Sequence, residues 1–371
     1  MLRLLRPAGL LLQVCFVLPG IPSPSAAAEP AITTVAFGSC ANQNLAQPIW
    51  DAIVAAKPDL FLFLGDNVYS DTLDPEVLRS AYAKLAAQEG FERLRRTSRV
   101  LATWDDHDYG TDDMGAEHPA KKEMKQVLLD FFEEPAGSER RRREGVYDAK
   151  LFGPPGRRVQ VILLDTRTFR GRLETGPWAD EADGQPGPYL PSRDRSVTLL
   201  GAEQWHWLEE QLRKPSEIRI IVSSIQVIAE DHRWEKWGNL PHERERLFDL
   251  IERTGVGTVI FLSGDRHAAE LSGTTLAGGT PVLDVTSSSL NAPLLWTNEI
   301  NHHRIGSRYH AENFGLATID WSGQAPRVTL EIRNLAGTPV IRHEVVPEVP
   351  HARSGGRVGV GVHKSWRRHA R

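Results

Sequence analysis

The segment that most constrains the fold is an apolar run that ends abruptly in acidic and aromatic residues. Residues 60–64 read LFLFL, and the chain continues GDNVYSD through residue 71. Because the glycine breaks the apolar run, Asp66 and Tyr69 are expected on a tight turn at the end of a buried strand. A carboxylate held rigidly on such a turn is well placed to bind a metal ion.

Three other segments repeat this pattern. Residues 37–40 (FGSC), 100–108 (VLATWDDHD) and 259–267 (VIFLSGDRH) each pass from an apolar strand to cysteine, aspartate or histidine. Four such strand ends are hard to obtain by chance, so we expect them to converge. The sequence therefore predicts one metal centre at the ends of four strands.

Strand-like runs alternate with amphipathic helical segments from about residue 34, which is typical of an α/β fold. The predicted strands are residues 34–38, 59–64, 99–103, 158–164, 218–224 and 258–263, and the predicted helices are residues 75–88, 119–132, 203–213 and 243–254. After residue 270, three further runs predict a strand-rich ending at residues 281–286, 315–320 and 327–333. No repeat or break in composition divides the chain, so one catalytic domain is expected over residues 29–350.

Residues 1–28 predict a cleaved signal peptide. A short basic segment precedes an apolar run at residues 8–17, and small residues follow at 25–28. The run is shorter than the roughly 20 apolar residues of a membrane span, and nearby prolines disfavour an uncleaved anchor. We therefore expect a secreted or periplasmic protein without a stable membrane span after cleavage.

Composition limits the remaining possibilities. Hydrophobic residues make up 40% of the 371 positions and the formal net charge is −4, so we expect a large core, a monomer and no nucleic-acid binding. Most of the ten tryptophans are interpreted as packing residues. The charge run at 139–144 is expected to be a solvated face, and residues 351–371 a disordered basic tail. The long loop at 171–194 is expected to frame the substrate entrance.

Cysteine usage also points to a metal. Loss of Cys15 with the signal peptide leaves Cys40 as the remaining cysteine, so no internal disulfide is expected. Metal coordination would protect a lone thiol in an oxidising compartment. The alternative is a buried apolar cysteine.

The candidate ligands divide into two sites by chemistry. Thiolate, phenolate and imidazole together suit ferric iron, whereas carboxylates suit a hard cation. The Fe³⁺ site would consist of Cys40, Asp66, Tyr69 and His267, and the site for Ca²⁺ or another divalent cation of Asp66, Asp106 and Asp265. Asp66 is the predicted bridge because its carboxylate has two oxygens. Two such metals can hold a hydroxide between them and stabilise a transferring phosphoryl group.

Three other polar residues near strand ends leave alternatives open. Arg167 would either contact the substrate phosphate or form a structural pair with an aspartate. Arg266 would either neutralise transition-state charge or form an outward salt bridge. Gln226 would either give its amide oxygen to the harder metal or play no part in binding.

The motifs GSC, GDNVY, WDDHD, LDTR and SGDRH together resemble the PhoD-like alkaline phosphatases of the metallophosphoesterase superfamily. Their order and spacing match from about residue 34 to 320. The resemblance implies a four-layered α/β/β/α sandwich of two mixed sheets, with the metals at strand carboxyl ends. It also implies a secreted phosphatase that depends on calcium and iron.

The same resemblance implies roles for single residues. Asp66 matches the bridging aspartate, and Asp106 stands where the superfamily uses a metal-binding asparagine. His107 matches the histidine that contacts the phosphoryl group or protonates the leaving oxygen. Asp108 stands where the family often has glutamate, so its role is left open. The family's metal-binding cysteine, tyrosine and late Asp–His pair correspond to Cys40, Tyr69, Asp265 and His267.

We therefore expect an exported metal-dependent phosphoesterase that hydrolyses phosphate monoesters, and diesters as a further class, by attack of a metal-bound hydroxide. His107, Asp66 and Arg266 would be catalytic, and His107 and Arg167 would bind a small phosphoester. One alternative is a phosphodiesterase or phospholipase C-like enzyme. The other is a phosphate-binding relative without catalysis. Neither a serine-hydrolase motif nor a phosphate-cradling Gly-Lys loop is present.

Overall fold

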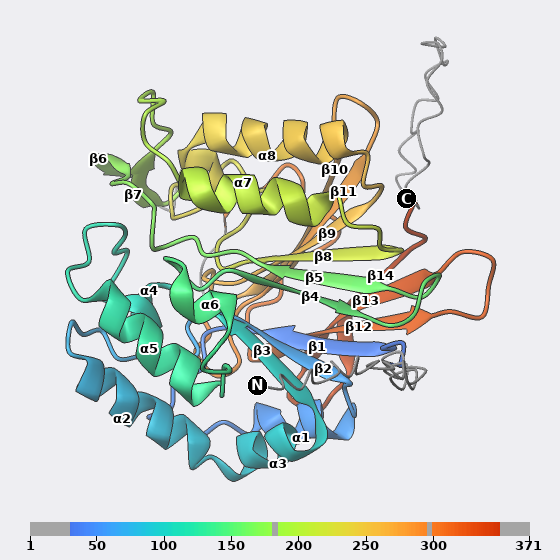
Figure 1. Ribbon diagram of the computed structural model, residues 1–371, viewed down its shortest axis with the longest axis horizontal. Helices are drawn as coiled ribbons and strands as arrows, with labels where there is room; N and C mark the ends of the chain where they lie inside the picture. The colour runs from blue at the N-terminus through green and yellow to red at the C-terminus, as the bar shows by residue number, and fades with distance from the viewer. Residues whose placement is uncertain (1–29, 180–184, 295–298, 349–371) are drawn as a thin grey trace, which may run out of the picture.

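The computed structural model describes residues 30–179, 185–294 and 299–348. In these residues two sheets pack face to face, and helices cover the outer face of each sheet (Figure 1). The strand order is β14-β13-β12-β1-β2-β3 in the first sheet and β10-β11-β9-β8-β5-β4 in the second. Each sheet contains parallel and antiparallel pairs. The predicted four-layered α/β/β/α sandwich is thereby confirmed.

The strands of the first sheet are β1 (Thr34–Gly38), β2 (Leu60–Leu64), β3 (Arg99–Thr103), β12 (Asn313–Asp320), β13 (Arg327–Asn334) and β14 (Pro339–Val345). The strands of the second are β4 (Asp148–Phe152), β5 (Val159–Leu163), β8 (Ile218–Ser223), β9 (Val259–Ser263), β10 (Ala269–Thr275) and β11 (Pro281–Ser287). A separate hairpin pairs β6 (Glu174–Ala179) with β7 (Gly187–Leu190). The helices are α1 (Ile49–Ala55), α2 (Pro75–Ala86), α3 (Glu89–Thr97), α4 (Asp106–Tyr109), α5 (Lys121–Phe131), α6 (Glu139–Arg142), α7 (Gly201–Leu212) and α8 (Pro241–Thr254), with a short 3₁₀ helix at Trp237–Asn239.

Strand β2 shows how the sequence fixes the layers. Its leucines face the second sheet, whereas Phe61 and Phe63 face the helices, where both pack against Trp50. All five residues of the strand are fully buried, as its unbroken apolar run predicts. Gly65 ends the strand with φ 109°, and a Cβ there would lie 2.6 Å from the Cβ of Asp105. Glycine is therefore required at this turn.

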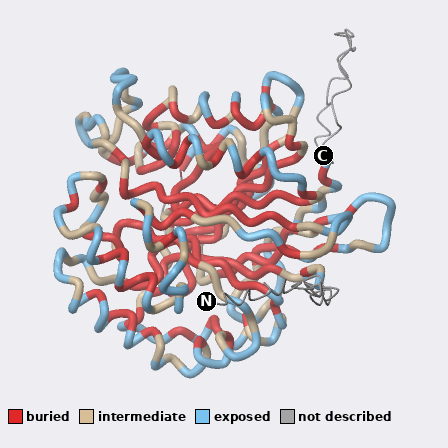
Figure 2. The backbone as a smooth tube through the Cα atoms, in the orientation of Figure 1, coloured by how far each residue is buried: buried red, intermediate tan, exposed pale blue. Residues whose placement is uncertain are grey.

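Three apolar cores hold the four layers together. One lies between the first sheet and α1, α2, α3 and α5, a second between the two sheets, and a third between the second sheet and α7 and α8. The buried backbone accordingly runs through the middle of the molecule, with exposed residues at its periphery (Figure 2). This packing holds the strand ends, and the side chains that follow them, in fixed positions.

All six predicted early strands occur within one residue of their expected ends, and the four predicted helices within two residues. The strand-rich ending is also present, as β10 to β14. The sequence analysis did not predict α1, α3 or β4. It also predicted a long loop over residues 171–194 without strands, whereas β6 and β7 pair there.

One expectation about exposure was wrong. In the charge run, Arg140 is buried, and it donates hydrogen bonds to the carbonyls of Ala102 and Val146, both at 2.6 Å. Trp178 is exposed rather than packed in a core. The predicted signal peptide and basic tail lie outside the described residues. Among the described helices, none has the length and apolarity needed to cross a bilayer.

Candidate metal centre

Four strand ends bring the predicted ligands to one edge of the sandwich. Strands β1, β2 and β3 are parallel neighbours, so Cys40, Asp66 and Asp106 follow their carboxyl ends at the same edge of the first sheet. Asp265 and His267 follow the carboxyl end of β9 in the second sheet. The face-to-face packing of the two sheets therefore creates the convergence that the sequence predicted.

Four of these residues adopt left-handed backbone conformations. The φ angles are 57° for Cys40, 49° for Asp66, 67° for Asp265 and 51° for His267. Residues with a Cβ avoid this region, and a strained backbone of this kind costs about 1–3 kcal/mol per residue. Such strain gathers at functional sites, where the surrounding structure holds it in place.

Thiol and phenol groups form one half of the centre. The Cys40 Sγ atom lies 3.3 Å from Asp66 Oδ2 and 3.1 Å from Ser288 Oγ. The Tyr69 hydroxyl is buried near this thiol but makes no hydrogen bond of good geometry in the described part of the chain. Burial, and then the charge of Asp66, raises the pKa of Cys40, while burial and Cys40 raise the pKa of Tyr69. Their anionic forms are therefore favourable only beside a cation.

His267 presents the imidazole. Its Nδ1 atom is bonded to the carbonyl of Ala292, which leaves Nε2 with the lone pair that a metal ligand requires. Burial lowers the pKa of His267, so the neutral ring is favoured. The backbone N–H of His267 donates to Ser288 Oγ at 2.7 Å, and this serine also contacts Cys40.

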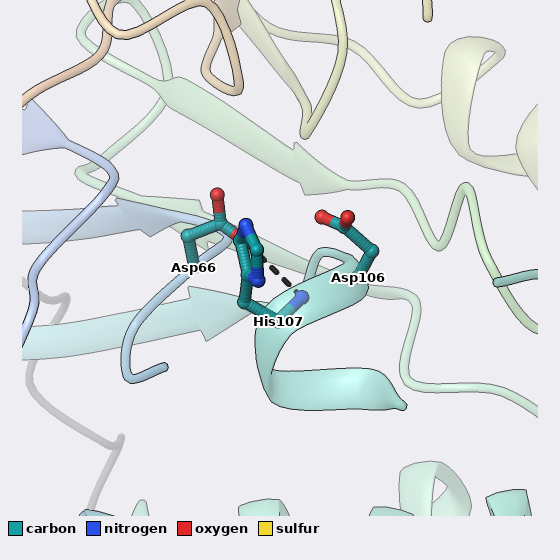
Figure 3. Close-up of side chains that lie close together, drawn as sticks. All are labelled: Asp66, Asp106 and His107. Atoms are coloured by element: carbon teal, nitrogen blue, oxygen red, sulfur yellow. Dashed lines mark hydrogen bonds between the residues drawn. The ribbon is translucent and has the colours of Figure 1, made fainter. Parts of the chain in front are cut away.

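Carboxylates form the other half. Ligand atoms of Asp66, Asp106 and His107 lie within 4.8 Å of one another (Figure 3). Burial raises the pKa of Asp66 and of Asp265. Burial also acts to raise the pKa of Asp106, but Arg167 and His107 outweigh it and lower this pKa to about 2.

Among the described residues, Asp265 is not part of the close group of Asp66, Asp106 and His107, but its carboxylate and that of Asp106 are of the type that suits a hard cation. Asp106 Oδ1 and Asp265 Oδ2 are buried without a hydrogen-bond partner among the described residues. The nearest guanidinium nitrogens, from Arg167 and Arg266, are 3.6 and 3.5 Å away. Buried carboxylate oxygens are ordinarily paired or bound to a metal. The donor sets thus suit a cation with sulfur, phenol and imidazole ligands beside one with oxygen ligands.

His107 is oriented by a second carboxylate. Its Nδ1 atom lies 2.6 Å from Asp71 Oδ1, and its ring stacks near Tyr69 with the ring centres 4.3 Å apart. Burial lowers the pKa of His107, but the charge of Asp66 and the hydrogen bond to Asp71 outweigh it and raise this pKa to about 11. The imidazole beside the centre can therefore carry a proton.

The geometry agrees with comparisons to known proteins. Residues 35–325 match the PhoD-like phosphatase family. The chain belongs to this family.

Relatives of this PhoD-like chain are distant in sequence. Alkaline phosphatase D of Bacillus subtilis (strain 168) is 21% identical over 287 residues, which cover 64% of this chain and 46% of that protein. The chain thus spans about half the length of this curated relative. A solved structure titled as that of PhoD has a TM-score of 0.65 at 16% identity, over 87% of this chain and 70% of the other. The structure of purple acid phosphatase PPD1 of yellow lupin (Lupinus luteus) has a TM-score of 0.58 at 14% identity, over 86% of this chain and 54% of the other. Both structures share the metallophosphatase fold.

Arg167 of this PhoD-like chain is engaged by protein carboxylates. It is 1% exposed; its Nε donates to Asp105 Oδ1, and its Nη2 lies 2.5 Å from Glu235 Oε2. Arg170 also contacts Glu235, at 3.1 Å. These contacts correspond to the structural pairing that the sequence analysis gave as one of two alternatives for Arg167. The Nη1 atom of Arg167 has no hydrogen-bond partner in the described residues, and its role toward substrate stays a prediction.

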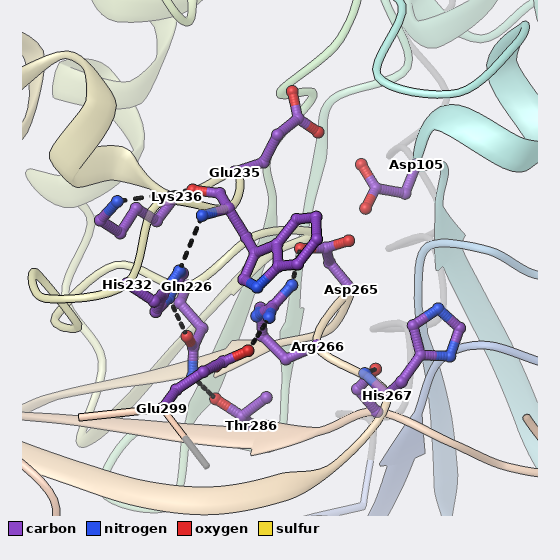
Figure 4. Close-up of polar contacts among 12 residues, drawn as sticks. Asp105, Gln226, His232, Glu235, Lys236, Asp265, Arg266, His267, Thr286 and Glu299 are labelled. Atoms are coloured by element: carbon purple, nitrogen blue, oxygen red, sulfur yellow. Dashed lines mark hydrogen bonds and ion pairs between the residues drawn. The ribbon is translucent and has the colours of Figure 1, made fainter. Parts of the chain in front are cut away.

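Arg266 is turned inward rather than outward. Its guanidinium forms ion pairs with Asp265 and with Glu299, which is 2% exposed (Figure 4). The outward salt bridge considered as an alternative is therefore not formed. Glu299 also pairs with Arg308 at 2.6 Å, so one buried carboxylate holds two arginines. This arrangement fixes the position of Arg266 beside a predicted metal ligand.

Gln226 and Asp108 make contacts within the protein. The amide oxygen of Gln226 is bonded to Nε2 of His232 at 2.9 Å, and its nitrogen donates to Thr286 and Glu270 (Figure 4). This oxygen is thus not directed at a metal. Asp108 accepts hydrogen bonds in the core, and its carboxylate supports the turn rather than the centre. Its donors are the Asp105 N–H, the Asn67 side chain and the Tyr82 hydroxyl.

Several residues near the centre were missed by the sequence analysis. Asp71 lay inside the most informative segment, at its end, but no spacing rule linked it to a histidine 36 positions later. Asp112 and Asp113 have carboxylate oxygens within 4.8 Å of Asp106. Glu235 comes from a loop without any strand signal, so nothing in its neighbourhood could have indicated its contact with Arg167.

Proposed function

We propose that this protein is an exported, metal-dependent phosphoesterase of the alkaline phosphatase type, acting on phosphate monoesters and on diesters. The observation that carries this proposal is the gathering of metal-binding side chains at one sheet edge, where Asp106 and Asp265 each have a buried carboxylate oxygen without a hydrogen-bond partner among the described residues. The residues concerned are Cys40, Asp66, Tyr69, Asp106, Asp265 and His267. Membership of the PhoD-like phosphatase family supports the reaction class.

Two cations are proposed for the centre. Fe³⁺ would be held by Cys40, Asp66, Tyr69 and His267, and Ca²⁺ or another divalent cation by Asp66, Asp106 and Asp265. Such a pair supplies a hydroxide nucleophile and neutralises charge on the phosphoryl oxygens. Asp66 is suited to bridging because it lies in the loop after β2 and contacts both halves of the donor set.

Side chains beside the metal centre would then bind the substrate and donate a proton to it. Protonated His107 can donate to a phosphoryl oxygen or give its proton to the leaving oxygen, and Asp71 holds its ring in place. Arg266, fixed by Glu299, adds positive charge beside Asp265 and is suited to a phosphoryl group that gains negative charge. Arg167 keeps Asp105 in place and has one nitrogen free for a substrate oxygen.

Export is proposed from the amino-terminal pattern of a basic segment, an apolar run and small residues. The proposed partner is a small phosphoester, and the proposed state is a monomer with no nucleic-acid partner.

The test is hydrolysis of a chromogenic phosphomonoester and of its matching diester by the mature protein, with and without a calcium chelator. We expect turnover that the chelator abolishes and that is faster with the monoester. A strong preference for the diester would instead identify a phosphodiesterase. Absence of turnover in protein that carries iron and binds phosphate tightly would indicate the non-catalytic relative.

A further inference from the structure

Two tryptophans connect the candidate metal centre with the surface. The guanidinium carbon of Arg266 lies 5.4 Å from the ring centre of Trp234. The same arginine pairs with Asp265 at 3.5 Å (Figure 4). The ring of Trp178 lies 5.2 Å from that of Trp234, at an interplanar angle of 79°. A continuous series of contacts thus leads from a predicted metal ligand to an indole ring that is 66% exposed.

The exposed ring is held in place by its surroundings. Trp178 belongs to β6, which pairs with β7, and the two strands are fixed to the loop that carries Trp234. The N–H of Tyr189 donates to the carbonyl of Arg233 at 2.9 Å, and the N–H of Arg233 donates to Pro186 at 2.8 Å. The Tyr189 hydroxyl also donates to Asp113, next to the centre, at 2.5 Å.

Two donors in this series have no partner. Trp234 Nε1 and Arg266 Nε are buried, and neither makes a hydrogen bond in the part of the chain that is described. Buried donors are ordinarily satisfied, so both are suited to an acceptor that a ligand brings. Phosphoryl and ester oxygens are such acceptors. The exposed indole further out offers a π face and no charge.

We propose that Trp178 and Trp234 form a subsite for a planar aromatic group of the substrate. This inference rests on the proposed phosphoesterase function and names its substrate class: phosphoesters whose leaving group carries an aryl ring or a nucleobase. The two indoles meet almost at a right angle, so a flat ring that stacks on one of them meets the other edge-on. Both arrangements are favoured between aromatic rings.

The test uses matched substrates that differ only in the ring. Adenosine 5′-monophosphate and ribose 5-phosphate share the same scissile primary ester, and only the former carries a base. Benzyl phosphate and cyclohexylmethyl phosphate form the corresponding aryl pair. We expect kcat/KM to favour the member with the aromatic ring by on the order of tenfold, a typical effect of one stacked base.

Variants of Trp178 test whether this residue causes the preference for substrates with an aromatic ring. Trp178→Leu is expected to bring the ratio of kcat/KM within each pair close to one, whereas Trp178→Phe should retain most of it. Trp207→Leu is the control, because Trp207 is a tryptophan on α7 whose ring packs on Arg143, at 5.2 Å, and on Tyr147, at 4.7 Å. This control should leave the ratio unchanged.

Equilibrium binding, measured by calorimetry, distinguishes a failure of the aromatic subsite from a failure of the proposed phosphoesterase function. Turnover of both substrates without a preference for the ring would overturn the subsite and leave the phosphoesterase in place. Tighter binding of adenosine 5′-monophosphate than of ribose 5-phosphate, lost in Trp178→Leu, would support the subsite even if neither compound were hydrolysed. A preference for adenosine 5′-monophosphate over ribose 5-phosphate, without a preference for benzyl phosphate over cyclohexylmethyl phosphate, would show that the subsite takes the base of a nucleoside.

Discussion

The Nδ1 atom of His107 lies 2.6 Å from a carboxylate oxygen of Asp71, a residue whose own backbone is left-handed with φ 45°. The pair joins the loop after β2 to the short helix α4 after β3. The hydrogen bond holds the ring so that the imidazole faces Asp66 and Asp106. A carboxylate in this position both orients the histidine and favours its protonated form.

Replacing Asp71 with asparagine should therefore change the pH dependence of the reaction. Burial lowers the pKa of His107, whereas Asp66 and Asp71 raise it. Removing the charge of Asp71 lowers this pKa, so the protonated imidazole is lost at a lower pH. We expect the alkaline limb of the kcat profile to move to lower pH, and kcat to fall on the order of tenfold or more. Asp249→Asn, at an exposed position, is the control, and an unmoved alkaline limb would contradict the assigned role.

Tyr69→Phe should alter the visible spectrum of the iron-loaded protein. A phenolate bound to ferric iron gives a violet charge-transfer band, and the Tyr69 hydroxyl is buried beside Cys40 without a hydrogen-bond partner of good geometry in the described residues. We expect the band to disappear, as measured by absorption spectroscopy on samples with equal iron content. Tyr147→Phe, whose ring packs on Trp207, should keep the colour. If the band persists in Tyr69→Phe, another ligand is responsible for it.

The layers and the positions of most candidate ligands could be predicted because both depend on local sequence. A strand such as β2, buried on both faces, must be apolar throughout, and the glycine after it marks where the chain turns. Ligands that follow such strands can be recognised from residue type alone. The sequence also indicated Cys40 as a candidate ligand, and this thiol is buried beside Asp66 and Ser288.

Contacts that depend on how distant loops meet could not be predicted. Asp71 and His107 are 36 residues apart, and Glu235 reaches Arg167 from a loop with no regular pattern. The charge run was misjudged for a related reason. Four consecutive charged residues at 139–142 form one helical turn, and only the packing of α6 decides that Arg140 points inward.

Metal removal should destabilise the protein. The charge of Asp106 opposes ionisation of both Asp66 and Asp265, and a bound cation would compensate this repulsion. A ligand that binds only the folded state, present at 100 times its dissociation constant, contributes about 2.7 kcal/mol. We therefore expect a chelator to lower the melting temperature by several degrees, and added metal to restore it. In Asp265→Asn the chelator should lower the melting temperature by less, because one predicted metal ligand is missing. A melting temperature insensitive to chelation in protein shown to contain metal would argue against this centre.

The left-handed backbone at Asp265 leads to a prediction about stability that is independent of catalysis. At φ 67° a residue with a Cβ is strained, and glycine is not. Asp265→Gly should therefore be more stable than Asp265→Ala by about 1–2 kcal/mol, although both variants lose the same carboxylate. The free energies of unfolding are compared by urea titration in the presence of chelator, so that metal affinity does not enter. Glu344, at an exposed position of strand β14, provides the control, since glycine there should be less stable than alanine by about 0.5–1 kcal/mol. The same order at both positions would show that the loop after β9 does not hold Asp265 in the strained conformation, and that its place in the centre needs another explanation.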